Sequence, residues 1–276
     1  MQQKSRFSCV CQKKAVTLHR KVEKYNEMKK ITISILWILF SCLSVWAETM
    51  DREQSSLVAG SAVRDTLMGV PCRVYLPAQY EQRVSERFPV LYLHHGMYGN
   101  ENDWIEQGAL IPIMDSLLRK GAIKEWLVIM PDNCPSRPTF EEEKANATTG
   151  EWENNFARFM DEAEHRYRIS HDPSERAVAG LSMGGYHTMR VSSVLKGQFA
   201  YVGMFSPATF VHNAPENYQL FWIGIGKDDF LYESLQEYRR WLDAEGVEYT
   251  YYETEGGHEW PNWQDYICRF LQLISR

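Results

Sequence analysis

The sequence has 276 residues, 44% of them hydrophobic and 13% aromatic, so it can bury one sizeable core and we expect a single folded domain. The first 47 residues hold 9 of the 30 basic side chains and 2 of the 36 acidic ones, which leaves the rest of the chain with a formal net charge of −13. Because so acidic a surface repels polyanions, the composition argues against nucleic acid as a partner.

An uncharged segment follows two lysines near the amino terminus. Lys29 and Lys30 lead into residues 31–47, which carry no charge and end in Val45-Trp46-Ala47. This order is typical of a secretory signal peptide and predicts export to the periplasm or the medium. We therefore expect a non-native or disordered leader at residues 1–27, a signal peptide at 28–47 that starts at Met28, and a folded domain at 48–276.

Two other interpretations of this segment remain open. A retained membrane anchor needs roughly 20 apolar residues, whereas this segment is shorter and contains several hydroxyl side chains. Leu39-Phe40-Ser41-Cys42 is similar to a bacterial lipobox, which would place a lipid on Cys42, but Phe40 fits that pattern poorly. The segment favours cleavage, after which we expect no stable insertion into a membrane.

Three cysteines lie beyond the leader: Cys72, Cys134 and Cys268. None stands in a Cys-x-x-Cys spacing, so the sequence predicts neither a metal site nor a redox motif. At most one disulfide can form among the three.

Beyond the leader, short apolar runs alternate with longer amphipathic stretches, which is the pattern of a layered α/β fold. Apolar runs such as Val90–Leu93 are typical of parallel strands covered on both faces. We expect a doubly wound, mostly parallel sheet of about eight strands with helices on both faces. The predicted strands are Leu57–Thr66, Cys72–Leu76, Pro89–His94, Trp126–Met130, Ala177–Ala179, Tyr201–Phe205, Leu220–Ile225 and Glu248–Glu253. The predicted helices are Leu110–Arg119, Trp152–Tyr167, Tyr186–Leu195, Glu233–Ala244 and Asn262–Ile274.

Ligands of such a sheet bind at the carboxyl ends of its strands, and several loops there carry reactive side chains. The widest irregular stretch, Asp132–Gly150, has two prolines and an acidic run. It either shapes a substrate cleft or is a solvated loop.

Gly180-Leu181-Ser182-Met183-Gly184-Gly185 joins a strand of small residues to a predicted helix. Glycines allow a sharp turn there, and such a turn holds a serine hydroxyl clear of its neighbours. The context predicts a nucleophile elbow with Ser182 as the nucleophile.

An earlier strand runs into His94-His95-Gly96-Met97, a turn that can aim a backbone N–H at a reacting carbonyl oxygen. The amides of Met97 and Met183 are therefore the predicted oxyanion hole. Because backbone donors leave side chains free, His95 is interpreted as a structural residue of the turn.

Two later strand ends supply the remaining groups of a triad. Asp228 and Asp229 follow one strand, and only one of them can point inward to orient a base. His258 follows the last strand within Gly256-Gly257-His258, where the glycines allow close approach to the serine. The order Ser, Asp, His is that of α/β hydrolases.

Together these residues resemble the esterase family of α/β hydrolases that includes feruloyl and acetylxylan esterases of carbohydrate esterase family one and S-formylglutathione hydrolases. The resemblance covers most of residues 57–274. It rests on Tyr75-Leu76-Pro77, Pro89–Trp104, Gly180–Gly185, Asp228–Tyr232 and Gly256–His258.

The resemblance implies an α/β-hydrolase fold and a triad of Ser182, Asp229 and His258, with no cofactor and no metal. In that family the acid stands three residues after the glycine of a Gly-x-x-Asp turn, which favours Asp229 over Asp228 when counted from Gly226. The family's oxyanion positions correspond to Met97 and Met183. His94 departs from the pattern, since an apolar residue is common there, and this suggests a polar group that tunes the substrate.

Export favours the polysaccharide esterases, because S-formylglutathione hydrolases serve a cytosolic route. We predict a serine carboxylic ester hydrolase that removes acetyl or feruloyl groups from plant polysaccharides such as xylan, with an acylated polysaccharide or small ester as its partner. Aromatic side chains near the motif loops could stack on a sugar or ferulate ring or simply pack in the core. The substrate-binding candidates are His94, Trp104, Trp152 and Trp260, with Trp263 beside them.

Other functions stay open at this point. The same acyl-enzyme chemistry would serve a siderophore-ester or trehalose-ester hydrolase, or an acyltransferase. A carbohydrate-binding protein could also keep the fold without turnover, although an intact Ser182, Asp229 and His258 argue against it.

Overall fold

The computed structural model describes residues 37, 40–42, 44–46, 59–133, 139, 142, 151–209 and 218–276. The chain divides into two compact units, Met1–Ser56 and Leu57–Arg276. In the first unit the described residues are helical, and most of the predicted signal peptide lies outside them, as do residues 1–27. No helix among the described residues has the length and apolar character that a membrane span requires.

The second unit is built on one eight-stranded sheet of described residues, in the order β1-β2-β4-β3-β5-β6-β7-β8. The first two strands pair antiparallel with their neighbours, and all pairings from β4 to β8 are parallel. This confirms the mostly parallel sheet expected from the apolar runs. The strands are β1 (Ser61–Leu67), β2 (Val70–Leu76), β3 (Val90–His94), β4 (Leu127–Pro131), β5 (Arg176–Leu181), β6 (Tyr201–Phe205), β7 (Leu220–Gly226) and β8 (Thr250–Thr254).

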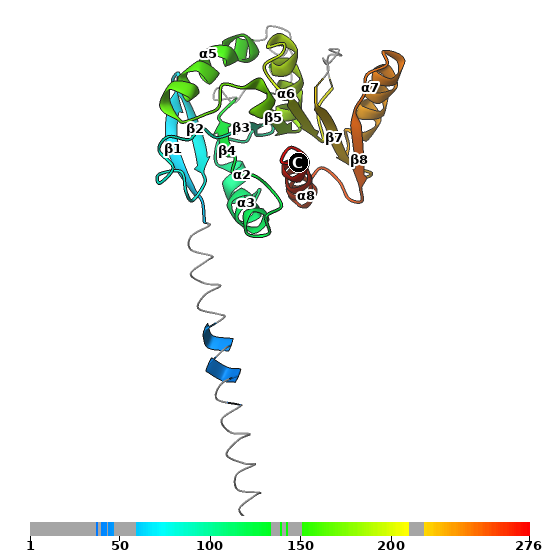
Figure 1. The fold of residues 1–276 in the computed structure, drawn as a ribbon. Coiled ribbons are helices and arrows are strands. Elements are labelled where there is room, and N and C mark those ends of the chain that lie inside the picture. Colours follow the sequence, from blue (N-terminus) through cyan, green and yellow to red (C-terminus); the bar gives the residue numbers. More distant parts are fainter. Residues whose placement is uncertain are drawn as a thin grey trace, which may run out of the picture. The chain divides into compact units, whose positions relative to one another are not determined.

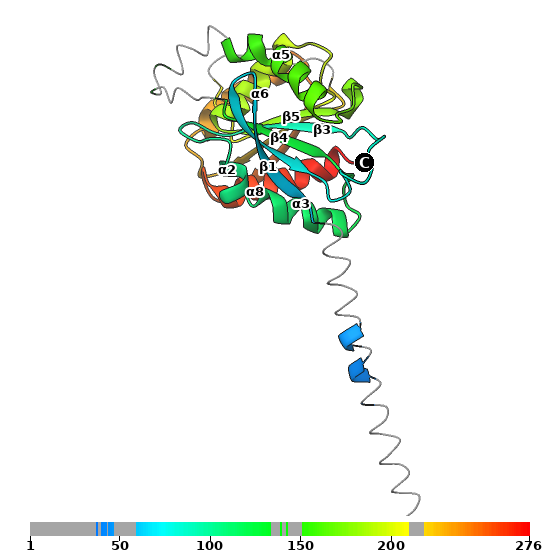
Figure 2. The ribbon, with the colours of Figure 1, turned by 90° about the vertical axis from the view of Figure 1, so that its left-hand side faces the viewer.

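Helices cover both faces of the sheet, so the unit has three layers (Figure 1). One face carries α5 (Glu151–Arg166), α6 (Met183–Val194) and α7 (Tyr232–Ala244); the other carries α2 (Asp103–Glu106), α3 (Leu110–Arg119) and α8 (Trp260–Leu273). Figure 2, turned by 90°, shows α5 and α6 on the opposite side of the strands from α3 and α8. Alternate side chains of β3 enter the two cores, with Tyr92 in one and Leu91 and Leu93 in the other.

All eight predicted strands and all five predicted helices are present, with ends that differ by a few residues. Two short elements were not predicted: α2, whose four residues are too few to show helical periodicity, and the 3₁₀ turn η1 (Pro173–Glu175). Cys72 and Cys268 are both free thiols, so neither forms the disulfide that was left open. Cys134 and most of the Asp132–Gly150 stretch lie outside the described residues.

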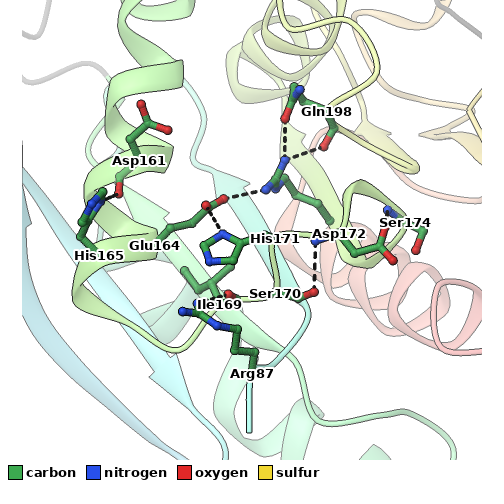
Figure 3. A network of polar contacts seen from close by, with 11 residues as sticks. Arg87, Asp161, Glu164, His165, Ile169, Ser170, His171, Asp172, Ser174 and Gln198 are labelled. Atoms are coloured by element: carbon green, nitrogen blue, oxygen red, sulfur yellow. Dashed lines mark hydrogen bonds and ion pairs between the residues drawn. The ribbon is translucent and has the colours of Figure 1, made fainter. Parts of the chain in front are cut away.

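A buried cation fixes the amino end of β5, the strand that leads to Ser182. Arg176 is 3% exposed, and its guanidinium donates to Glu164 of α5 across 2.6 Å and to the Gln198 side chain across 2.8 Å. His171 contacts the second oxygen of Glu164 at 2.6 Å (Figure 3). Because a buried charge is tolerated only when it is paired, this network joins α5 to the central strand at the end remote from the serine.

Candidate active site

Ser182 occupies a strained turn between β5 and α6. Its φ of 55° and ψ of −118° fall outside the regions that non-glycine residues commonly adopt. Its N–H donates to the Phe205 carbonyl across 2.8 Å, and its own carbonyl accepts from Ala208 N–H at 3.0 Å. The end of β6 and the loop after it therefore hold the turn from both sides, so that it can present a nucleophile as an elbow does.

Gly184 lets two backbones come together below the serine. A Cβ atom at this position would collide with the carbonyl oxygens of His94 and His95. The first turn of α6 thus lies directly against the end of β3. This close approach brings the predicted oxyanion turn next to the elbow.

His258 and Asp229 meet because β7 and β8 are neighbours. Gly226 pairs with Thr254 at the end of the two strands, so the loops that follow lie side by side. His258 Nδ1 is 3.0 and 2.9 Å from the two carboxylate oxygens of Asp229. Its Nε2 is 2.9 Å from Ser182 Oγ. The structure therefore brings the three predicted triad residues into one hydrogen-bonded chain.

The structure separates the two adjacent aspartates. Asp229 is 4% exposed and faces His258, whereas Asp228 is exposed to solvent. Burial by itself raises the pKa of the Asp229 carboxyl. The hydrogen bond from His258, the hydrogen bond from Leu231 N–H and the charge of His258 outweigh burial, so the pKa lies below its ordinary value. Asp229 is thus held ionised, the form that orients and stabilises an imidazolium.

The two predicted oxyanion donors border the same pocket as Ser182. Met183 is the first residue of α6, where a backbone N–H has no acceptor within the helix. Within the described part of the chain, Met97 N–H donates to no backbone carbonyl. Both amides are therefore available to an oxygen bound beside Ser182.

His94, a predicted substrate-binding residue, does not line the pocket at Ser182. Its side chain is fully buried on the α5–α6 side of the sheet, where Nε2 accepts from Trp152 Nε1 across 3.3 Å. Nδ1 lies 3.3 Å from Thr188 Oγ1, which donates to the Gly184 carbonyl across 2.8 Å. Burial, followed by the charges of His187 and His95, lowers the pKa of His94 well below its ordinary value. His94 is a neutral link between α5 and the first turn of α6.

Trp104 and Trp152, which were also predicted to contact substrate, do not line the pocket at Ser182. Trp104 is 1% exposed and donates through Nε1 to the His94 carbonyl across 3.0 Å. Trp152 is partly buried and packs on His94 and Phe156, and it does not line the pocket at Ser182. Both indoles support the framework below the site.

His95 has the structural role that the sequence predicted. It is fully buried, and its Nδ1 lies 2.6 Å from the Gly96 carbonyl while its Nε2 lies 3.2 Å from Asp132 Oδ1. The ring thereby fixes the turn that ends in Met97.

The pocket at Ser182 has a volume of about 670 Å³. Trp260, a predicted substrate-binding residue, lines this pocket, and so does Trp263. The ring of Trp263 packs edge to face on the His258 imidazole, with ring centres 4.9 Å apart. The other lining side chains were not among the predicted site residues, although some of them belong to the sequence motifs described above. These are Tyr98, Asn100, Asp103, Gln107, Leu181, Ala208, Phe230 and Leu231.

Asp103 gives one wall of this pocket a titratable group. Its half-buried position raises the pKa of its carboxyl, an effect that the His95 charge partly offsets. No group of three or more His, Cys, Asp or Glu side chains among the described residues is arranged to hold a metal ion.

Residues 68–233 match the model of the family described as "Putative esterase". A protein of Xylanibacter ruminicola named endo-1,4-beta-xylanase/feruloyl esterase is 31% identical over 211 residues; the match covers 74% of this chain but only 29% of that protein. An acetyl esterase of Caldicellulosiruptor saccharolyticus is 24% identical, with 70% of this chain and 85% of that protein covered. Among solved structures, a ferulic acid esterase from Anaeromyces mucronatus superposes with a TM-score of 0.67 at 20% identity, covering 77% of this chain and 90% of the other. That likeness confirms the α/β-hydrolase fold.

Proposed function

The chain belongs to this esterase family. From that premise we propose that it is a serine carboxylic ester hydrolase that removes feruloyl or acetyl groups from plant polysaccharides outside the cytoplasm. The observation that carries the proposal is the hydrogen bond of 2.9 Å between Ser182 Oγ and His258 Nε2, with Asp229 on the other ring nitrogen. A serine becomes a good nucleophile when a base is in contact with its hydroxyl.

In the acylation step, His258 Nε2 takes the proton of Ser182 Oγ as Oγ bonds to the ester carbonyl carbon. The amides of Met97 and Met183 donate to the oxyanion that forms. His258 then gives its proton to the alcohol oxygen as the carbon–oxygen bond breaks. Deacylation repeats these steps with water as the nucleophile, and the acid leaves from Ser182.

The shape of the pocket supports a bulky acyl group. A volume of about 670 Å³ is in the range of pockets that hold drug-sized ligands, and an acetyl group would fill little of it. Trp260 offers an aromatic surface, and Asp103 and Gln107 offer polar groups to a hydroxylated acyl chain. The structure from Anaeromyces mucronatus contains ferulic acid, and the Xylanibacter ruminicola relative is named as a xylanase and feruloyl esterase.

An acetyl group remains the second candidate because one curated relative is named an acetyl esterase. A comparison of kcat/KM on feruloylated arabinoxylan oligosaccharides and on acetylated xylan distinguishes the two proposed specificities. Trp260→Ala should raise KM for the feruloyl substrate more than for the acetyl substrate. The aromatic ring of a feruloyl group would lose more contact surface with Trp260 than the methyl group of an acetyl would. Equal effects on both would contradict the assignment of the pocket to an aromatic acyl group.

The role of Ser182 is tested by Ser182→Ala, with Ser193→Ala on the same helix as the matched control. We expect Ser182→Ala to abolish labelling by a fluorophosphonate probe and to lower kcat on methyl ferulate at least about a thousandfold. Ser193→Ala should retain both. Labelling and turnover that survive in Ser182→Ala would contradict the mechanism, whereas oligosaccharide binding by a wild-type protein that never labels would indicate a binding protein.

Export is proposed from the uncharged segment at residues 31–47, which follows Lys29 and Lys30. Fractionation of cells that express the chain with and without residues 28–47 tests it. We expect the enzyme outside the cytoplasm, and processed, only when the segment is present. A Cys42→Ala variant that is released where the parent stays on the membrane would identify a lipoprotein instead.

A further inference from the structure

Phe230 is a large apolar side chain exposed beside the reacting groups. It is 75% exposed, although Asp229 next to it is 4% exposed. Its ring centre lies 4.6 Å from that of the His258 imidazole, with 55° between the planes, and it lines the pocket of Ser182. Because this ring is mostly exposed and lines the pocket, its face is open to a ligand bound beside His258.

The turn that carries Phe230 is fixed by its neighbours. Asp229 N–H donates to the Gly226 carbonyl across 3.2 Å, and Asp229 O accepts from Tyr232 N–H at 2.9 Å. The Asp229 carboxylate also accepts from Leu231 N–H at 2.9 Å. Because hydrogen bonds bracket Phe230 on both sides, its backbone is already ordered, which lowers the entropic cost of using it as a binding surface.

The direction of proton transfer decides which half of an ester meets Phe230. His258 Nε2 must give its proton to the leaving oxygen, so the alcohol half passes beside the imidazole. Phe230 is in ring contact with that imidazole. Asp103 of α2 and Trp260 line the same pocket, and the ring of Trp260 packs on that of Trp104 in α2 with centres 5.4 Å apart. The leaving alcohol therefore passes beside Phe230.

We propose that Phe230 determines specificity for the leaving alcohol by stacking its exposed face on the sugar ring that carries the ester. The inference rests on the proposed function, because it takes the alcohol to be a sugar. A sugar ring has a face of C–H groups that packs on an aromatic ring, and a small alcohol such as methanol offers no comparable surface. The chemical steps at Ser182 and His258 are those given above, and Phe230 adds only binding of the alcohol half.

The test compares two esters of one acid in Phe230→Ala, Phe230→Trp and the wild type. The substrates are a feruloylated arabinoxylan oligosaccharide and methyl ferulate; acetylated xylotriose and methyl acetate replace them if acetyl is the preferred acyl group. In Phe230→Ala, kcat/KM on the sugar ester should fall about fivefold or more relative to the small ester, chiefly through KM. Phe230→Trp should restore the preference. Val84 is another exposed apolar side chain, with 70% of its surface accessible. Val84→Ala should leave kcat/KM unchanged on both substrates.

The outcomes separate this inference from the function on which it rests. If the wild type cleaves both esters and Phe230→Ala loses activity equally on both, Phe230 acts on His258 and not on the sugar, and the inference is overturned. It is also overturned if Phe230→Ala behaves as the wild type. If the wild type cleaves methyl ferulate but no sugar ester, the proposed polysaccharide substrate is wrong, and the assignment of Phe230 is wrong with it.

Discussion

The indole Nε1–H of Trp104 donates to the backbone carbonyl of His94 across 3.0 Å. This bond joins α2, which forms one wall of the pocket, to the end of the strand that leads to Met97. Trp104→Phe keeps most of the ring but removes the donor, and we expect it to lower the free energy of unfolding by about 1–2 kcal/mol.

The same substitution should also lower kcat, because the turn with the Met97 amide loses a support. Trp126→Phe is the matched control: Trp126 is equally buried and donates through Nε1 to Ser275 Oγ across 3.0 Å, away from the pocket. Denaturant unfolding and kcat on methyl ferulate check both variants. If Trp126→Phe lowers kcat as much as Trp104→Phe does, the loss reflects general destabilisation.

Asp229→Asn should lower kcat by about 10³- to 10⁴-fold, because the amide no longer stabilises the imidazolium and can favour the wrong tautomer of His258. Asp228→Asn changes the neighbouring exposed carboxylate and should leave kcat near the wild-type value. Steady-state kinetics of both variants on one soluble ester measures the two values of kcat. Similar losses in the two variants would mean that the buried contact with His258 is not what matters.

Gly184→Ala should displace the end of β3 from α6, because the added methyl group meets the carbonyl oxygens of His94 and His95. We expect a loss of about 1–3 kcal/mol in unfolding free energy together with a fall in kcat. Gly197→Ala has a φ of 71° and open space around it, so it should cost about 1 kcal/mol through backbone strain without changing kcat. A fully active Gly184→Ala enzyme would contradict the role of this close approach.

His94 should make the stability of the protein depend on pH. Its pKa in the folded state is well below the ordinary value of 6.5, so the unfolded chain binds the proton first as the pH falls. The stability is therefore complete above about pH 6.5 and decreases below it, by at most about 1.4 kcal/mol per pH unit for this one group.

His94→Gln should reduce that slope, whereas His165→Gln, at an exposed position on α5, should keep it. Urea unfolding at several values between pH 7.5 and 5 measures the slopes. Identical slopes in the wild type and His94→Gln would show that other groups cause the decrease.

The strands and the triad could be predicted because each depends on local signals. Apolar runs mark the buried strands, and glycines mark the turns at Ser182 and His258. The choice of Asp229 over Asp228 depended on the family spacing, and the structure agrees because only Asp229 is buried against the imidazole.

The substrate-binding residues were harder to predict, because burial depends on tertiary packing that a sequence does not display. His94, Trp104 and Trp152 stand next to motif residues in the chain, yet their side chains point into the core or pack on it. Phe230 was quoted in a motif without a role, since nothing local distinguishes an exposed phenylalanine from a buried one.

The order of the strands also affects how the enzyme loses activity. Ser182 follows the fully buried central strand β5, while His258 follows β8, an edge strand with no fully buried residue. Edge strands open more readily than central ones. In rising urea, fraying of β8 should therefore separate the base from the nucleophile while the rest of the sheet is intact, so catalysis should fail before circular dichroism reports unfolding. The tolerance of this enzyme to harsh conditions is then limited by its weakest strand and not by its core.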